Sequence, residues 1–303
     1  MLRISLVVAL VLWGLALPAC CPVCKEASPA SPRRPAVTLR AKVDGPPARV
    51  VFLARHGRTD MNRISQIGGQ LHGVHLDALG YKQRVGLFLL LKDEPIRAIF
   101  TSTLRRTIQT AVPLAAHFGL VPVASADLNE FRGGVSEGIC YSLLGKHPLN
   151  PSGAGCDMTS DDPLVKRAEA FLKAENRRRF KVGVTYRWPG GGESLVDVDK
   201  RLTHFLRSVP MSLSSKTILI VGHSGANRFL LAKMMGWKML DALRVRMDNT
   251  DVFRIERRAG QPPLLKVFHR GKWLLCDQPP TFRRGLPCLK RARKPKPTPP
   301  PTK

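Results

Sequence analysis

The chain of 303 residues is short of acidic residues: 22 Asp and Glu stand against 49 Lys and Arg, and the formal net charge is +27. Such an excess favours anionic partners, whether phosphorylated small molecules, nucleic acid or an anionic membrane surface, but it does not indicate a fold. Aromatic residues make up only 6% of the chain. Few of them lie among the basic residues and no known module is present, so the sequence does not favour nucleic-acid binding.

Long hydrophobic runs are also missing. The run Ile4–Ala16 is too short to span a bilayer comfortably, and its place after Arg3 is typical of an export signal. The letters LPAC at residues 17–20 resemble the lipobox of bacterial lipoproteins, which makes Cys20 a candidate lipidation site. Because Pro18 is unusual in that box, a plain secreted protein is the alternative, and an uncleaved anchor is another. We expect a signal peptide over residues 1–20 and an exported protein, either periplasmic, membrane-anchored or secreted.

The seven cysteines do not form a metal-binding pattern. Cys21 and Cys24 have the CxxC spacing, but neither a second cysteine pair nor a histidine pair lies nearby, so we expect no zinc site. An exported chain can form disulfides, and the spacing of the scattered cysteines leaves their pairing open.

Two segments of low complexity border the part of the chain that can fold. Residues 21–48 are rich in Pro, Ala, Ser and Arg, which predicts a flexible tether, and the basic, Pro-rich residues 277–303 predict a disordered tail. The tail could bind an anionic membrane surface, or it could simply be solvated. Residues 49–276 form the single predicted domain, and 44% hydrophobic residues in the whole chain allow a sizeable core. The sequence does not indicate an oligomeric state.

Short strand-like runs alternate with helical patterns inside this domain. The runs read RVVFLA, IRAIFTS, KTILIVGHS and NTDVFRIERR. The hydrophobic period predicts helices over residues 76–91, 103–118, 163–180, 194–209 and 226–235. Strands that alternate with helices favour an α/β fold with a mostly parallel central sheet covered on both faces.

Polar residues follow three of the predicted strands. His56 and His223 each follow an apolar run, and parallel strands would bring both imidazoles to the same edge of the sheet. A third run leads to Ser102 and Thr103, either of which could cap a helix that carries Arg105 and Arg106 in its first turn. A helix start beside an arginine is a site for an anion. Each feature alone has an ordinary structural explanation, but together they favour a functional site.

Two Gly-rich loops complete the set of motifs. LNEFRGGVSEG holds Glu130 and Glu137, and WPGGGESLVDV precedes a predicted helix. The second loop lacks the Lys and Ser/Thr spacing of a P-loop and does not fit a dinucleotide-binding fingerprint.

Seven segments, taken in order, resemble the histidine phosphatase superfamily, the phosphoglycerate mutase-like proteins. They are ARHGRTDMN, GGQLHGVHLDALG, TSTLRRTIQTA, LNEFRGGVSEG, PGGGES, VGHSGANR and MDNTDVFRIE. The resemblance implies a three-layer α/β/α sandwich and a covalent phosphohistidine mechanism that needs neither a metal nor another cofactor. The expected substrate is a phosphorylated small molecule, or a broad range of them.

The resemblance also implies roles for individual residues. His56 is expected to take the phosphoryl group, while Arg55, Arg106 and His223 bind its oxygens through charge-assisted hydrogen bonds. Glu130 is expected to protonate the leaving group and later to deprotonate water.

Asn62 and Gly57 are expected to contact the bound phosphate. Glu137 is a rival for the acid role, although its place suits a structural turn. Glu193 is expected at a helix start, with substrate contact as the alternative.

Some positions depart from the family pattern. Arg58 stands where many relatives have Glu or Gln and would add a cation at the pocket lip. Thr59 and Met61 exclude the acid-phosphatase branch with the RHGxRxP motif. The long insertion of true mutases is missing, which favours hydrolysis over isomerisation. A mutase-type phosphotransferase and a non-catalytic, anion-binding relative are the alternatives.

Overall fold

The computed structural model describes residues 50–141, 163–213, 216–249, 251–257, 262–269 and 271–276. All of them belong to the unit Leu39–Lys303. The predicted signal peptide with Cys20, the tether and the basic tail lie outside the described residues.

Among the described residues, seven strands form one sheet in the order β3-β2-β4-β1-β5-β6-β7. The strands are β1 (Val50–Arg55), β2 (Ile96–Ser102), β3 (Val123–Ser125), β4 (Thr217–Gly222), β5 (Val252–Glu256), β6 (Leu264–His269) and β7 (Lys272–Cys276). The first four strands in the sheet order pair in parallel, and β5, β6 and β7 are added by antiparallel pairing. Since β6 runs with the parallel strands, the sheet is mostly parallel, as predicted.

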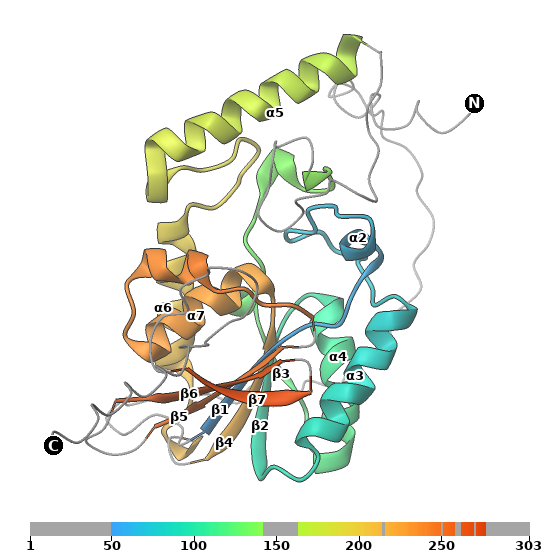
Figure 1. The fold of residues 1–303 in the computed structure, drawn as a ribbon, viewed down its shortest axis with the longest axis vertical. Coiled ribbons are helices and arrows are strands. Elements are labelled where there is room, and N and C mark those ends of the chain that lie inside the picture. Colours follow the sequence, from blue (N-terminus) through green and yellow to red (C-terminus); the bar gives the residue numbers. More distant parts are fainter. Residues whose placement is uncertain are drawn as a thin grey trace, which may run out of the picture. The chain divides into compact units, whose positions relative to one another are not determined.

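Helices cover both faces of the sheet (Figure 1). One face is covered by α3 (Ala78–Leu91) and α4 (Arg105–Phe118). The other face is covered by α6 (Leu195–Ser208) and α7 (Ser224–Met235). Strand β1 shows how the sequence specifies the layers: Phe52 and Ala54 pack with the α3–α4 cluster, whereas Val51 and Leu53 pack with the α6–α7 cluster. Successive side chains of a strand point to opposite faces. The predicted three-layer α/β/α sandwich is therefore confirmed.

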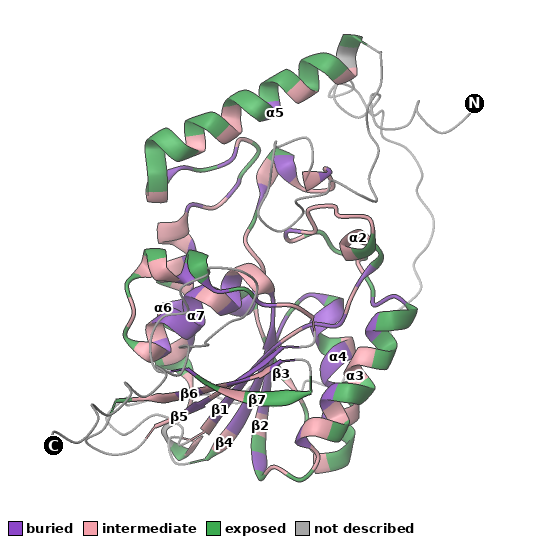
Figure 2. Ribbon diagram, in the orientation of Figure 1, coloured by how far each residue is buried: buried purple, intermediate pink, exposed green. Residues whose placement is uncertain are grey.

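The remaining α-helices in the described part are α2 (Asp60–Arg63) and α5 (Pro163–Val182). Figure 2 shows that buried residues concentrate on the strands and on the helix faces toward them, whereas most of α5 is exposed. No helix of the described ranges is both long and apolar enough to cross a membrane. Cys140 and Cys276 are both disulfide-bonded.

The register of the parallel strands places three loops at one edge of the sheet. Arg55 pairs with Gly222 at the ends of β1 and β4, and Thr101 near the end of β2 pairs with Val221. The residues that follow these strands therefore lie side by side. This edge is where open α/β sheets place their ligands.

Candidate active site

Two imidazoles lie next to each other at this edge. His56 follows β1 and His223 follows β4, and their ring centroids are 5.1 Å apart. Both side chains are buried. The His56 N–H donates to the Gly222 carbonyl at 2.9 Å, which extends the pairing of the two strands by one residue. The predicted convergence of the two histidines is thus present.

The surroundings of His56 leave one ring nitrogen free to react. Its Nδ1 lies 2.7 Å from the carbonyl oxygen of Gly57. Because a carbonyl oxygen only accepts, Nδ1 carries the proton and Nε2 keeps its lone pair. Burial, and then the charges of Arg106 and Arg55, lower the pKa of His56 well below its usual value. The ring is therefore neutral near pH 7, as a nucleophile must be.

His223 is held from the opposite side. Its Nε2 lies 2.7 Å from the Ser102 hydroxyl oxygen. Its Nδ1 is buried and has no hydrogen-bond partner within the described residues. Burial, followed by the charge of Arg106, lowers the pKa of His223 as well. The unpartnered Nδ1 is available to a ligand.

Two guanidinium groups accompany the histidines, that of the buried Arg106 and that of the half-buried Arg55. Arg55 donates Nη1 to the Met247 carbonyl at 3.1 Å, and Arg106 donates to the carbonyls of Gly69 (2.7 Å) and Leu71 (3.3 Å). Burial lowers the pKa of Arg106 to about 10, so it stays charged at neutral pH. No carboxylate of the described chain forms a direct ion pair with either group. Since buried charges need a counter-charge, the pair constitutes a site for an anion.

The start of α4 distinguishes the two neighbouring arginines and corrects one expectation. Arg106 is buried and Arg105 is exposed, so the arginine that the resemblance assigns to the phosphate is the one whose side chain lies inside the protein. Ser102 does not cap α4, because the N-cap is Leu104, which has no side-chain hydrogen bond. The Ser102 hydroxyl instead accepts the Leu104 N–H at 3.1 Å and contacts His223.

The side chain of Glu130 lies at the start of α7, where it accepts main-chain N–H groups. Its carboxylate accepts the N–H groups of Gly225 and Ala226, both at 3.0 Å, and that of Phe131 at 2.8 Å. A Cβ at position 225 would collide with Glu130 Oε1, so this contact requires glycine there. The carboxylate is thus fixed at the positive end of the helix that follows His223.

Asn62 and Gly57 have different relations to the site. Asn62 Oδ1 accepts the Thr59 N–H (3.3 Å) in the capping box of α2, which leaves the Nδ2 donors for other partners. The Gly57 N–H donates to Thr110 Oγ1 at 3.0 Å, and its carbonyl accepts from His56. A Cβ at Gly57 would lie 2.7 Å from the Gly80 carbonyl oxygen. Gly57 therefore orients His56, and its expected contact with phosphate stays a prediction.

Two further carboxylates, those of Glu137 and Glu193, support the Gly-rich loops. Glu137 Oε1 accepts the N–H groups of Gln70 (2.9 Å) and Gly133 (2.8 Å), which fits the structural turn. Glu193 precedes the helix N-cap and pairs with Arg201 at 2.8 Å. It also accepts the Arg132 N–H, so both of its oxygens are engaged within the protein.

Arg58 does not add a free cation at the pocket lip. Its Nε donates to Asp77 Oδ2 at 2.6 Å, so the charge is paired. The expectation of an additional cation there is corrected by this ion pair.

Sequence reasoning missed several residues around the site. Arg201 donates to the carbonyls of Asp127, Asn129 and Glu130, and so holds the segment that carries the carboxylate. Burial and then the charge of Arg55 lower the pKa of Arg228, which belongs to the same basic cluster. Arg228 lies inside the segment VGHSGANR, so the motif contained it without assigning it a role. Within the described ranges, no three His, Cys, Asp or Glu side chains gather as a metal site.

At the carboxyl ends of its parallel strands, this α/β fold brings together two imidazoles of lowered pKa and two guanidinium groups that form no ion pair with a described carboxylate. The chain belongs to the histidine phosphatase superfamily (branch 1), whose family model matches residues 51–177 and 165–269.

Two relatives and one solved structure, taken as examples, match this chain at 22–30% identity. Phosphoglycerate mutase-like protein 4 of Arabidopsis thaliana is 30% identical over 182 residues, which cover 59% of this chain and 68% of that protein. The 6-phosphofructo-2-kinase/fructose-2,6-bisphosphatase of Aquarana catesbeiana is 27% identical over 184 residues, which cover 61% of this chain and 32% of that protein. The alpha-ribazole phosphatase of Shigella flexneri has the same fold, with a TM-score of 0.55 and 22% identity over 69% of this chain and 91% of that one.

Proposed function

We propose that this protein is a metal-independent phosphomonoesterase that forms a phosphohistidine at His56. The observation that carries the proposal is the neutral His56 ring beside the guanidinium groups of Arg55 and Arg106, neither of which forms an ion pair with a described carboxylate. A phosphoryl group brings negative charge, which these cations would stabilise, and a neutral imidazole can attack phosphorus.

The first step would use His56 as the nucleophile. Nε2 of His56 attacks phosphorus, an N–P bond forms, and the bond from phosphorus to the substrate oxygen breaks. The carboxyl group of Glu130 gives its proton to the leaving oxygen, so an alcohol departs. The Nδ1–H of His56 stays hydrogen-bonded to the Gly57 carbonyl oxygen, 2.7 Å from Nδ1, and this bond helps to stabilise the positive charge that forms on the ring.

The second step would release phosphate. The Glu130 carboxylate takes a proton from water, the water oxygen attacks phosphorus, and the N–P bond breaks. Arg55 and Arg106 balance the charge on the non-bridging oxygens throughout, and His223 Nδ1–H donates to one of them. In this arrangement the Ser102 hydroxyl donates to Nε2 of His223.

Transfer of the phosphoryl group to a second substrate, as in a mutase, is the alternative. One relative is named as phosphoglycerate mutase-like and another includes a bisphosphatase in its name. The same phosphoenzyme serves both reactions, and the outcome depends on whether water or an alcohol accepts the group.

Export is part of the proposal. The run Ile4–Ala16 and the LPAC letters support a signal over residues 1–20, with Cys20 as the lipidated residue if the lipobox is used. The disulfides at Cys140 and Cys276 support it too, because disulfides persist in oxidising compartments. The basic residues 277–303 would bind an anionic membrane surface. If a chain truncated after Cys276 binds anionic vesicles at low salt as well as the full chain, this role of the tail is excluded.

The proposed reaction is tested with purified protein in EDTA and a panel of phosphomonoesters that includes p-nitrophenyl phosphate. We expect release of inorganic phosphate by the wild type and none by His56→Ala, with the fold of the variant checked by circular dichroism. Turnover by His56→Ala at the wild-type rate would contradict the mechanism. Transfer to an added alcohol at the expense of phosphate release would favour the mutase alternative.

A further inference from the structure

A short turn before β5 contacts both of the groups assigned to phosphoryl transfer. This turn, which we call the β5-entry turn, consists of Met247–Asn249 and Asp251. The Met247 carbonyl accepts Nη1 of Arg55 at 3.1 Å, and Asn249 Nδ2 donates to the His56 carbonyl at 2.7 Å. The position of the turn therefore affects both the guanidinium group and the main chain of the nucleophile.

A buried carboxylate holds this turn. Asp251 Oδ2 accepts the Asp248 N–H at 3.1 Å, and the Asp251 N–H donates to the Asp248 carbonyl at 3.2 Å. The other oxygen, Oδ1, lies 2.5 Å from His269 Nδ1, and both side chains are buried. Val252 pairs with Phe268 in the β5–β6 ladder, so Asp251 and His269 meet one residue beyond it.

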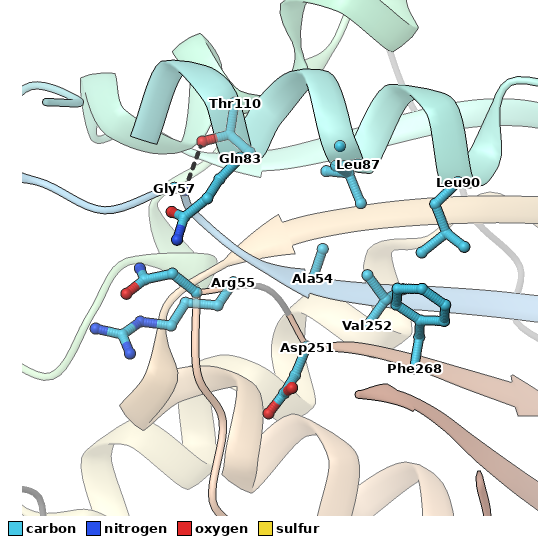
Figure 3. Close-up of a pocket in the computed structure, with 12 residues that line it drawn as sticks. Ala54, Arg55, Gly57, Gln83, Leu87, Leu90, Thr110, Asp251, Val252 and Phe268 are labelled. Carbon is cyan, nitrogen blue, oxygen red and sulfur yellow. Dashed lines mark hydrogen bonds between the residues drawn. The ribbon is translucent and has the colours of Figure 1, made fainter. Parts of the chain in front are cut away.

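Packing does not support the turn on every side. A cavity of about 180 Å³ lies beside it, with Asn249 and Asp251 in its lining. Figure 3 shows Leu87, Leu90, Val252 and Phe268 around the apolar part of this cavity. Side chains that border a cavity lack packing contacts there. Met247 packs in the α6–α7 core cluster, whereas Asn249 and Asp251 border the cavity, so the position of this second part of the turn depends on its hydrogen bonds.

We propose that the buried Asp251–His269 pair positions the active site by fixing the β5-entry turn, and through it Arg55 and the main chain of His56. Neither member contacts the phosphate site directly, so both are positioning residues. The inference rests on the proposed roles of His56 and Arg55. Burial raises the pKa of Asp251, and the hydrogen bond from His269 opposes that shift. His269 thus favours the ionised carboxylate, which accepts both hydrogen bonds.

The test compares His269→Leu with His269→Asn. Leucine removes the donor to Asp251, whereas asparagine can place an amide N–H near the position of Nδ1. We expect His269→Leu to lower kcat on the order of ten- to a hundredfold at a temperature where it is folded, because displacements near 1 Å have such effects. We expect His269→Asn to recover most of the rate. His204→Leu is the matched control, since His204 forms a 2.6 Å contact with Asp127 away from the turn, and its kcat should equal that of the wild type.

Binding of inorganic phosphate, measured by calorimetry, gives a readout that does not need turnover. His269→Leu should weaken phosphate binding, because Arg55 loses its fixed position, whereas His204→Leu should not. If the wild type binds phosphate but hydrolyses no ester, the proposed function fails and the inference is judged on affinity. Wild-type kcat and phosphate affinity in folded His269→Leu would overturn the inference.

A second variant covers the case in which His269→Leu does not fold. Asn249→Ala removes only the contact of the turn with the His56 carbonyl, and Asn249 is partly exposed. We expect a similar loss of kcat, because the turn then no longer holds the main chain of His56. An unchanged kcat in Asn249→Ala would contradict the inference independently of His269.

Discussion

The two halves of the sheet contribute to the site in different ways. In the parallel half, β3-β2-β4-β1, strand ends lead directly to the groups that would meet a phosphate: His56, His223 and Arg106. The antiparallel half, β5-β6-β7, provides none of these, but Asn249 and Asp251 at its start hold the backbone that carries His56. Contact with the anion and placement of the contacting groups are thus supplied by separate parts of one sheet.

The largest effect on the parallel half is expected from Glu130→Gln. The amide keeps the shape of the carboxyl group but can neither give nor take the proton, so steady-state turnover should fall on the order of 10²- to 10⁴-fold. With p-nitrophenyl phosphate, whose leaving group needs no proton, a burst of one p-nitrophenol per enzyme should precede the slow phase in a stopped-flow record. Turnover at the wild-type rate without a burst would remove Glu130 from the mechanism.

Two adjacent arginines in the first turn of α4 allow a buried and an exposed cation of the parallel half to be compared. Arg106→Ala removes a buried cation and should lower kcat/KM by about 10²- to 10³-fold, in the range found for a lost charge-stabilising donor. Arg105→Ala is the matched control, because its side chain is exposed and it should leave kcat/KM unchanged. Equal losses in the two variants would show that the effect is not specific to the anion site.

A smaller effect is expected from Ser102→Ala, which acts on orientation within the parallel half. The change removes the partner of His223 Nε2, at 2.7 Å, without touching the phosphate site. A lost hydrogen bond of this kind is worth about 1 kcal/mol, so kcat should fall by roughly a factor of five to ten. Ser102→Thr should restore part of the rate if the hydroxyl is what matters. A loss of thermal stability with an unchanged kcat would contradict the orienting role.

The smallest expected effect concerns the stability of the phosphate-free protein in acid. Folding lowers the pKa of His56 below the unfolded value of 6.5, so the unfolded chain binds more protons below that pH. The contribution of this group to the free energy of unfolding should therefore be fully present above pH 6.5. It should fall with the pH below that value, by at most about 1.4 kcal/mol per pH unit. Urea unfolding at several pH values should show that the free energy of unfolding depends less on pH in His56→Gln than in the wild type. Identical slopes would contradict the neutral, buried imidazole.

Much of the fold could be predicted because the central elements have strong local patterns. Strands β1, β2 and β4 are apolar runs buried on both faces, and each of the five predicted helices is present with its ends within two residues of the expected ones. The convergence of His56 and His223 followed from parallel pairing alone. The choice of Arg106 over Arg105 depended on the family spacing.

Other features depend on contacts that a sequence does not display. Strand β3 has only three residues and exposes Val123, while β7 exposes Trp273 and Leu275, so neither has a clear apolar pattern. The Asp251–His269 pair joins residues 18 positions apart and requires the β5–β6 register. The Gly57 N–H finds its acceptor, Thr110 Oγ1, 53 residues away on α4.

The most direct measurement is to search for a phosphorylated His56 during turnover. The wild type and His56→Ala would be mixed with p-nitrophenyl phosphate, quenched in alkali within milliseconds, digested and analysed by mass spectrometry. We expect an acid-labile, alkali-stable phosphoryl group on His56 that appears before phosphate is released and is absent from the variant. Turnover by the wild type with no phosphorylated His56 at any time, or with the group on another residue, would contradict it.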